Sequence, residues 1–264
     1  MNRTYPALLI ACAAAAPALA AGPGPRADAG LLPGWQQEDG ARLAGLRIAL
    51  APGWKTYWRN PGDAGIPPRF DWSGSSNVAD VQVLWPRPHA FEAFGYRTIG
   101  YKEEVTLPLR VTPVDPAQPI ALRLSMEYGV CSDICVPEAA ELAIDIAPGE
   151  TGGEAPIRAA WAARILPAAE AGLSVERCTI AGAGLQRRFE GRFRAAAPFT
   201  TPPVVVVEAG EDVWIAPAEV TLDGDAILAG AEVELLSEDQ WVDRDSIDVT
   251  LLGDDQAMVA FGCR

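Results

Sequence analysis

The stretch YGVCSDICVP, residues 128–137, holds the only closely spaced cysteine pair in this 264-residue chain. In an extended strand, residues four positions apart are separated by roughly 13 Å at about 3.3 Å per residue, whereas a disulfide needs Cα atoms within about 7 Å. If Cys131 and Cys135 pair, the residues between them must form a turn or one helical turn, with Gly129 and Pro137 at its two ends. We interpret the segment before the pair as a scaffold that presents it.

A bridge between Cys131 and Cys135 would close a very short loop. Such a loop removes little conformational entropy from the unfolded chain, so the bridge would stabilise the fold less than a long-range one. A weakly stabilising bridge is a candidate for chemistry, and we take Cys131 and Cys135 as the catalytic pair. A local structural staple is the alternative. Asp133 between the cysteines would raise the pKa of their thiols.

Four cysteines remain once the first twenty residues are set aside. An even number in an exported chain suggests two disulfides, for which three connectivities are formally possible. Position favours Cys131 with Cys135 and Cys178 with Cys263. The second bridge would close a long loop and constrain the unfolded chain by roughly 4 to 5 kcal/mol in the entropic model. We therefore assign Cys178 and Cys263 to a structural disulfide.

Residues 1–20 are typical of a secretory signal peptide. Arg3 precedes an apolar run that ends in the residues ALA, which fit the small-x-small rule of signal peptidase. Residues 9–12 (LIAC) also resemble a lipoprotein cleavage site, which would make Cys12 a lipidated N-terminus, but the apolar run before Cys12 is short. We expect cleavage after residue 20. No later segment approaches the roughly 18 apolar residues that a membrane helix needs, so the chain is not expected to span a membrane.

The sequence carries a formal net charge of −14. Such a charge repels nucleic acid and anionic lipid surfaces, so nucleic-acid binding is excluded. The sole histidine, His89, is interpreted as a surface residue, because with two distant cysteines it makes an incomplete zinc set. The sequence also lacks a Ser-His-Asp set, a phosphate loop and an HExxH motif. No metal and no cofactor are expected.

Residues 31–148 are expected to form one β-domain, because short apolar or alternating runs are separated by Gly- and Pro-rich turns. The tryptophans of these runs could line a ligand groove, but we interpret them as core, where aromatics at strand spacing more often lie. Seven or so strands match the number in an immunoglobulin-like sandwich. We expect strands at 43–50, 54–58, 67–72, 78–85, 104–109, 120–128 and 141–147, and an aromatic loop at 86–101.

A second small β-sandwich-like domain is expected over residues 157–264, after a linker at 149–156 that is rich in Gly, Glu and Pro. Residues 157–171 predict a helix, since Trp161 and Ile165 fall on one face, and Pro167 limits it. Six strand-like runs follow it. They lie at 173–180, 188–194, 204–208, 213–216, 232–236 and 246–252.

Several motifs of residues 31–148 occur in an order that resembles a known family. They are GWKTYWRNPGDAGIPPRFDWSGSSNV, VLWPRP, an aromatic loop ending in GY, VTLPL and YGVCSDICVP. In this order they are similar to the N-terminal periplasmic domain of the DsbD and ScsB group of thiol:disulfide interchange proteins. The resemblance implies an immunoglobulin-like periplasmic domain whose cysteine pair shuttles two electrons between a membrane-embedded thiol-disulfide transporter and soluble periplasmic proteins with disulfides.

Carried over by position, the resemblance implies that Cys131 and Cys135 are the redox pair. It also implies that Phe91, Phe94 and Tyr96 belong to a cap loop that shields the pair. The best-known members place five residues between their cysteines, where this sequence has three. No membrane domain or thioredoxin-like CxxC domain is found in this sequence, so we expect that it cannot run the full electron relay alone.

Two other functions remain open from the residues. One is a non-catalytic periplasmic binding module with structural disulfides, in which the aromatic loop docks onto a partner. The other is copper(I) handling by Cys131, Cys135 and Met126, because soft sulfur ligands select that ion.

Overall fold

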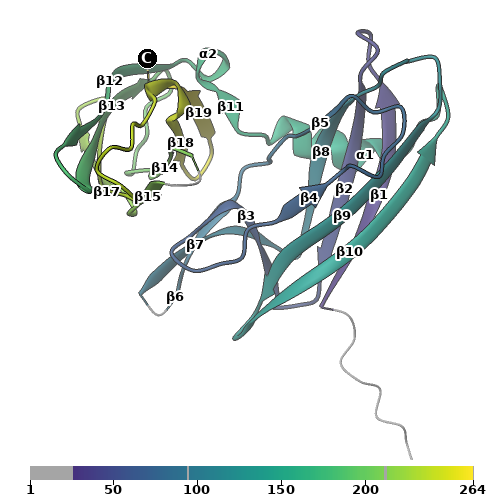
Figure 1. Ribbon diagram of the computed structural model, residues 1–264, viewed down its shortest axis with the longest axis horizontal. Helices are drawn as coiled ribbons and strands as arrows, with labels where there is room; N and C mark the ends of the chain where they lie inside the picture. Colours follow the sequence, from purple (N-terminus) through teal and green to yellow (C-terminus); the bar gives the residue numbers. More distant parts are fainter. Residues whose placement is uncertain (1–25, 94, 211–212, 264) are drawn as a thin grey trace, which may run out of the picture.

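The structure is a computed structural model that describes residues 26–93, 95–210 and 213–263. Two β-rich lobes follow one another along the chain, with a helix close to the point where they meet (Figure 1). The expected signal peptide and Cys12 lie outside the described residues, so the expectations for them stay predictions.

The first lobe is a β-sandwich of two sheets that share one apolar core. Leu46 and Leu109 from one sheet and Leu122 and Leu124 from the other are almost completely buried in the same cluster. One sheet has the order β1 (Ala27–Gln36), β2 (Arg42–Leu50), β8 (Glu104–Thr112) and β5 (Asp80–Val83). The other has the order β10 (Cys135–Ile146), β9 (Ile120–Cys131), β3 (Lys55–Gly62), β7 (Tyr96–Lys102) and β6 (His89–Ala93), and β4 (Arg69–Asp71) also pairs with β9.

This sandwich confirms the expected all-β, immunoglobulin-like fold, and most expected strands are present. Trp58 is completely buried, and Trp54, Trp72 and Trp85 pack against the same core, as expected of core aromatics. Strand β1 was not expected and begins at Ala27. The strand contains a proline and a glycine, which normally indicate a turn. A register shift after Leu32 accommodates both residues inside the strand.

The aromatic segment 86–101 was expected to be a loop, and this interpretation is wrong. Most of it forms the antiparallel hairpin of β6 and β7, with Gly95 in the left-handed region at the turn (φ 82°). Ile99 and Tyr101, two residues apart, are both buried in the sandwich core, as expected of residues that share one face of a strand. The prolines and glycines of the segment masked this short alternation.

The expected helix over 157–171 is also wrong, because the chain forms two short helices there. Helix α1 (Glu154–Ala162) begins inside the expected linker, directly after Gly153, and packs on the first lobe through the fully buried Ile157. A proline disfavours helical backbone in the residue before it, and β11 (Leu166–Pro167) is accordingly extended, ahead of α2 (Ala168–Ala171).

The second lobe is another β-sandwich, as expected, with more strands than the six predicted. Phe189 and Phe193 from one sheet and Leu251 from the other are completely buried in a shared core. One sheet has the order β11, β19 (Ala257–Phe261), β18 (Asp248–Leu252) and β14 (Val204–Glu208). The other has the order β12 (Leu173–Gly182), β13 (Gln186–Ala195), β17 (Ala226–Leu235) and β15 (Val213–Ile215), and β16 (Glu219–Asp223) also pairs with β17. A 3₁₀ turn, η1 (Arg244–Ser246), precedes β18.

The two lobes are in contact through apolar and ionic groups. Val206 and Leu252 of the second lobe are buried in the same cluster as the core of the first lobe. Arg59 on β3 donates to both carboxylate oxygens of Glu208 on β14, with the shortest distance at 2.8 Å. Strand β3 therefore contributes both to the contact between the lobes and, at its other end, to the surroundings of the cysteine pair.

Candidate redox site

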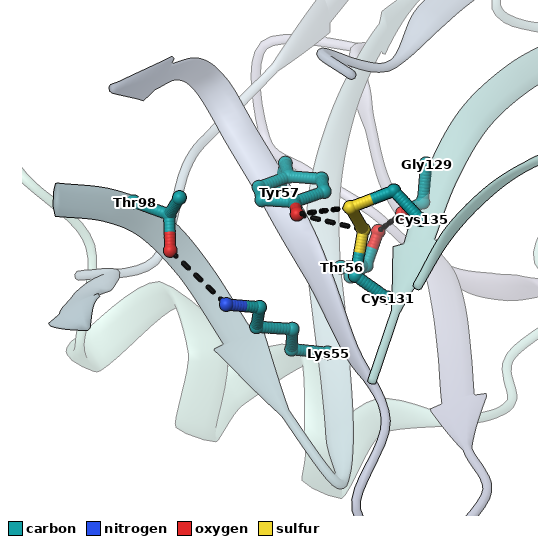
Figure 2. Close-up of a disulfide and its surroundings, with 7 residues drawn as sticks. All are labelled: Lys55, Thr56, Tyr57, Thr98, Gly129, Cys131 and Cys135. Atoms are coloured by element: carbon teal, nitrogen blue, oxygen red, sulfur yellow. Dashed lines mark hydrogen bonds between the residues drawn. A yellow bond between two sulfur atoms is a disulfide. The ribbon is translucent and has the colours of Figure 1, made fainter. Parts of the chain in front are cut away.

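The cysteine pair lies at the tip of the hairpin formed by β9 and β10. Cys131 ends β9, Cys135 begins β10, and the two are register partners with Cα atoms 4.1 Å apart. This separation fits the closer, non-hydrogen-bonded type of antiparallel pair, for which about 4.5 Å is typical. The two form a disulfide (Figure 2). The expected turn is present, because the amide of Ser132 donates to the carbonyl of Ile134 at 3.1 Å.

The ends of this turn differ from the expectation. Gly129 and Pro137 were expected to punctuate it, but they are paired with each other inside β9 and β10. The hairpin is therefore continuous up to the cysteines themselves, and only three residues form its tip.

The disulfide lies on the outer face of its sheet, away from the sandwich core. Side chains alternate along a strand, and the even-numbered residues from Leu122 to Val130 face the core. Met126 therefore belongs to the core, whereas Cys131 projects to the opposite face. This placement contradicts the copper(I) site that was considered with Met126, because the thioether and the sulfurs lie on different faces.

The side chain of Tyr57 covers the sulfur atoms on this outer face. Its hydroxyl donates to the Sγ atom of Cys131 at 2.7 Å and lies 3.2 Å from the Sγ atom of Cys135 (Figure 2). Tyr57 is only 3% exposed, and this burial raises the pKa of its phenol. Tyr57 is held by strand pairing, because it lies opposite Gly100 on β7.

The segment that follows β3 folds over Tyr57 and the hairpin. A methyl group on Gly129 would lie 2.7 Å from the Cβ atom of Ile66 and 3.1 Å from the ring of Tyr57, and one on Gly65 would lie 2.7 Å from that ring. Only glycine permits such close approach. Residues 63–66, which directly follow β3, thus form a cover over Tyr57 and the hairpin.

The two cysteines differ sharply in access to solvent. Cys131 is 1% exposed, whereas Cys135 is exposed, as are Ser132, Asp133 and Ile134 at the tip. Tyr57 and the cover enclose Cys131, whereas residue Cys135 lies at a tip that another molecule can approach. Such a difference in access suits thiol–disulfide exchange, because one sulfur reacts with the partner and the other then attacks the mixed disulfide to resolve it.

The residues expected in a cap loop lie on the β6–β7 hairpin. Phe91 is half-buried opposite Thr98 and lies beneath the ammonium groups of Lys55 and Lys102, at 5.6 and 4.4 Å. Tyr96 is 58% exposed and lines a cavity of about 410 Å³ between the two lobes. Phe94 lies outside the described residues. A shielding role for these three residues stays a prediction.

Cys178 and Cys263 form the second disulfide of the chain. Cys178 on β12 is 3% exposed and Cys263 is 1% exposed, and both belong to the core of the second lobe. The guanidinium of Arg244 donates to the carbonyl of Cys178, and the amide of Cys263 donates to the carbonyl of Arg244. A bridge enclosed in this way is suited to a structural role.

The sequence did not predict that Tyr57 lies beside the cysteine pair. Its position in the run 54–58 indicated a half-buried strand, and nothing in the sequence reveals which residue of a distant strand becomes its neighbour. The described residues hold no group of three or more His, Cys, Asp or Glu side chains that could bind a metal ion. None of the helices in this part of the chain is long and apolar enough to cross a membrane.

Comparisons with known proteins agree with this geometry. Residues 28–146 match the family model described as "Thiol:disulfide interchange protein DsbD, N-terminal". The N-terminal periplasmic domain of ScsB from Proteus mirabilis has a similar structure, with a TM-score of 0.63 and 20% sequence identity over 90% of this chain and 92% of that chain. A chimeric titin Z1Z2 also aligns, at 12% identity over 88% of this chain and 95% of that chain, but its TM-score of 0.18 carries no argument. No curated protein sequence matches the chain.

Proposed function

We propose that this protein, whose residues 28–146 form a domain of the DsbD N-terminal family, transfers electrons by thiol–disulfide exchange at Cys131 and Cys135. The observation that carries the proposal is the asymmetry of the pair. Cys135 is exposed at the hairpin tip, and Cys131 is buried against the hydroxyl of Tyr57. A bridge that served only to hold the hairpin would not require this difference in access.

In the proposed reaction, the thiolate of reduced Cys135 attacks one sulfur of a partner disulfide. A mixed disulfide forms and the other partner sulfur leaves as a thiolate. The thiolate of Cys131 then attacks the sulfur of Cys135, which restores the intramolecular bridge and releases the second partner sulfur. The partner disulfide gains two electrons and, with two protons from water, becomes a dithiol, while the Cys131–Cys135 pair is oxidised.

Tyr57 supports this reaction at the buried sulfur. A hydrogen bond to a charged acceptor is stronger than one to a neutral acceptor, so the Tyr57 hydroxyl favours the thiolate of Cys131 over its thiol. The same enclosed position keeps small oxidants away from Cys131 while the pair is reduced.

The partners are proposed from the family alone. DsbD-type interchange proteins and the periplasmic domain of ScsB point to a periplasmic location, with a membrane thiol-disulfide transporter as the electron source and periplasmic proteins with disulfides as acceptors. We place the chain in the periplasm and assign the expected signal peptide to its export.

Trapping of mixed disulfides tests the proposal. Cys131→Ser leaves the exposed Cys135 without a resolving thiol, so this variant is expected to accumulate mixed disulfides with oxidised partners. Cys135→Ser leaves only the buried Cys131 and is expected to trap few or none. Ser132→Ala, at the same tip, is the control and keeps full exchange. Equal trapping by both cysteine variants, or unchanged exchange in both, would refute the proposed role of the pair.

A further inference from the structure

The chain contains only two lysines, Lys55 and Lys102, and the structure places them beside the disulfide. Lys55 on β3 is the register partner of Cys131 on β9, and Lys102 on β7 is the register partner of Lys55. Since Cys135 is the partner of Cys131, one row crosses four strands in the order Cys135, Cys131, Lys55, Lys102. Side chains directly opposite one another project to the same face of a sheet, so both lysines share the outer face with the cysteines.

This arrangement is unfavourable for the isolated protein. Like charges directly opposite each other on neighbouring strands destabilise a sheet. Within the described residues, every ion pair is made by an arginine, and neither lysine has a carboxylate oxygen within 4.0 Å. Burial and the neighbouring Lys102 lower the pKa of Lys55. No carboxylate of the chain therefore offsets the repulsion between the two lysines. Such a pair is expected on a surface where an anionic group of a binding partner neutralises it.

Both ammonium groups are nevertheless held in defined positions. The Nζ atom of Lys55 lies 3.2 Å from the hydroxyl of Thr98 and 5.6 Å from the ring centre of Phe91, and that of Lys102 lies 4.4 Å from the same ring centre. Figure 2 shows the side chain of Lys55 extending away from the disulfide toward Thr98. Phe91 thus supports the two cations on its face, an arrangement that stabilises them without neutralising their charge.

One further cation, Arg87, lies near Lys102. It lines a cavity of about 370 Å³ together with Lys102, His89 and Glu104, and the carboxylate of Glu104 pairs with Arg47. The whole chain has a net charge of −14, so this basic region contrasts with its overall charge. An acidic partner would be repelled by most of the surface and attracted here, which would orient it toward the disulfide.

We propose that Lys55 and Lys102 bind carboxylates on the surface of a partner protein that flank its reactive cysteine. The inference rests on the proposed exchange function and names the chemistry of the partner. Strands of a sheet lie about 4.8 Å apart, so the backbone of Lys102 is two strands, or about 10 Å, from that of Cys131. Carboxylates spread around a cysteine on a folded surface match this spacing. The lysines take no part in bond making and act only by binding and orienting the partner.

Exchange kinetics with matched peptides test the proposal. The reduced protein is mixed with two disulfide-bridged peptides that differ only in carrying Glu or Gln beside the bridge, at low and at high salt. Lys55→Gln/Lys102→Gln is expected to slow exchange with the Glu peptide by about tenfold at low salt, with little change for the Gln peptide. Arg177→Gln/Arg188→Gln removes the same charge from exposed positions of the second lobe and is expected to have little effect.

The outcomes separate this inference from the proposed function. Equal loss with both peptides, no loss with either, or an equal effect of the arginine control would overturn the lysine proposal while leaving exchange established. If the unmodified protein exchanges with neither peptide, the proposed function fails. In that case the lysine proposal is decided by equilibrium binding of the Glu peptide to Cys131→Ser/Cys135→Ser, measured with and without the lysine substitutions. Binding that depends on the lysines supports the proposed binding surface. Binding that does not depend on them, or no binding, refutes it.

Discussion

The two sulfur atoms of the hairpin bridge lie in different environments, because the sheet and its cover enclose one and expose the other. Cys131 is fixed between β10 and β3 and lies under Tyr57, whereas Cys135 faces outward beside the exposed Ile134. In the proposed exchange a partner disulfide would meet Cys135 first, and the roles proposed for the two cysteines rest on this difference in exposure.

Tyr57→Phe tests the contribution of the hydroxyl to the reduced state. The phenol donates to the sulfur of Cys131, and a donor that stabilises a thiolate lowers the thiol pKa. The variant is expected to raise the pKa of the Cys131 thiol and to slow exchange by up to about tenfold. The measurement is the pH dependence of thiolate ultraviolet absorbance in the reduced protein. Tyr96→Phe, at an exposed tyrosine, is the control, and a thiol pKa unchanged in Tyr57→Phe would contradict the assigned contact.

Buried tyrosines also predict how stability depends on pH. Burial raises the pKa of Tyr57 and Tyr101, while an unfolded tyrosine titrates near about 10. Above that pH the unfolded chain loses a proton that the folded chain keeps. The free energy of unfolding is therefore constant with respect to these groups below about pH 10 and falls as the pH rises further. Urea midpoints at about pH 8 and pH 11 check this, with a smaller decline expected in Tyr57→Phe. A midpoint that rises with pH would contradict it.

At the scale of elements, the β9–β10 hairpin could be predicted only in part. The need for a turn between Cys131 and Cys135 followed from distance alone, and the structure has it. That Gly129 and Pro137 continue the strands did not follow, because both residues normally mark turns. The role of Gly129 depends on Ile66, which passes over Gly129 and leaves no room for a side chain. This contact joins distant segments, and no local pattern encodes it.

The β6–β7 hairpin and the helix region show two further limits of the sequence. In β7 the buried Ile99 and Tyr101 give a correct strand signal, but it is short and enclosed by turn-forming residues. In the second region the apolar pattern of residues 157–171 resembled one helix. Helix α1 instead ends at Ala162, and Pro167 keeps Leu166 extended, because the residue before a proline avoids helical backbone. Both errors arise where a local backbone restriction and a periodic pattern disagree.

The second disulfide is expected to act on stability alone. It joins β12 to the end of the chain across 85 residues, and loss of a native disulfide typically costs about 2 to 5 kcal/mol. Cys178→Ala/Cys263→Ala should therefore lower the free energy of unfolding of the second lobe by that amount, as measured by urea denaturation. Exchange at Cys131 and Cys135 should be unaffected in protein that remains folded. Loss of exchange in such folded protein would instead give Cys178 and Cys263 a share in the chemistry.

At the scale of the whole molecule, strand β3 links the β9–β10 hairpin to the second lobe. Lys55 and Tyr57 lie at the disulfide, and Arg59, two residues on, pairs with Glu208 of β14. The two β-sandwiches were predictable from strand number and spacing. This link was not, because Arg59 and Glu208 are 149 residues apart and each resembles an ordinary surface charge in the sequence.

A double-mutant cycle on Arg59→Ala and Glu208→Ala tests the contact between the lobes. Both side chains are about three-quarters buried, and hydrogen bonds to charged groups contribute about 1.5 to 3 kcal/mol. We expect a coupling energy near the lower end of that range, and unfolding of the two lobes at more widely separated urea concentrations. Arg47→Ala, which breaks a more exposed pair within the first lobe, should cost about 0 to 1 kcal/mol. No coupling between Arg59 and Glu208 would show that apolar packing alone joins the lobes.

The reduction potential of the Cys131–Cys135 pair tests the central claim most directly. The protein is equilibrated with glutathione buffers, and the free thiols at each cysteine are counted by mass spectrometry. A pair that exchanges electrons is predicted to titrate between about −270 and −120 mV, while Cys178 and Cys263 remain oxidised. A Cys131–Cys135 potential below about −300 mV, as in structural bridges, would contradict the redox function.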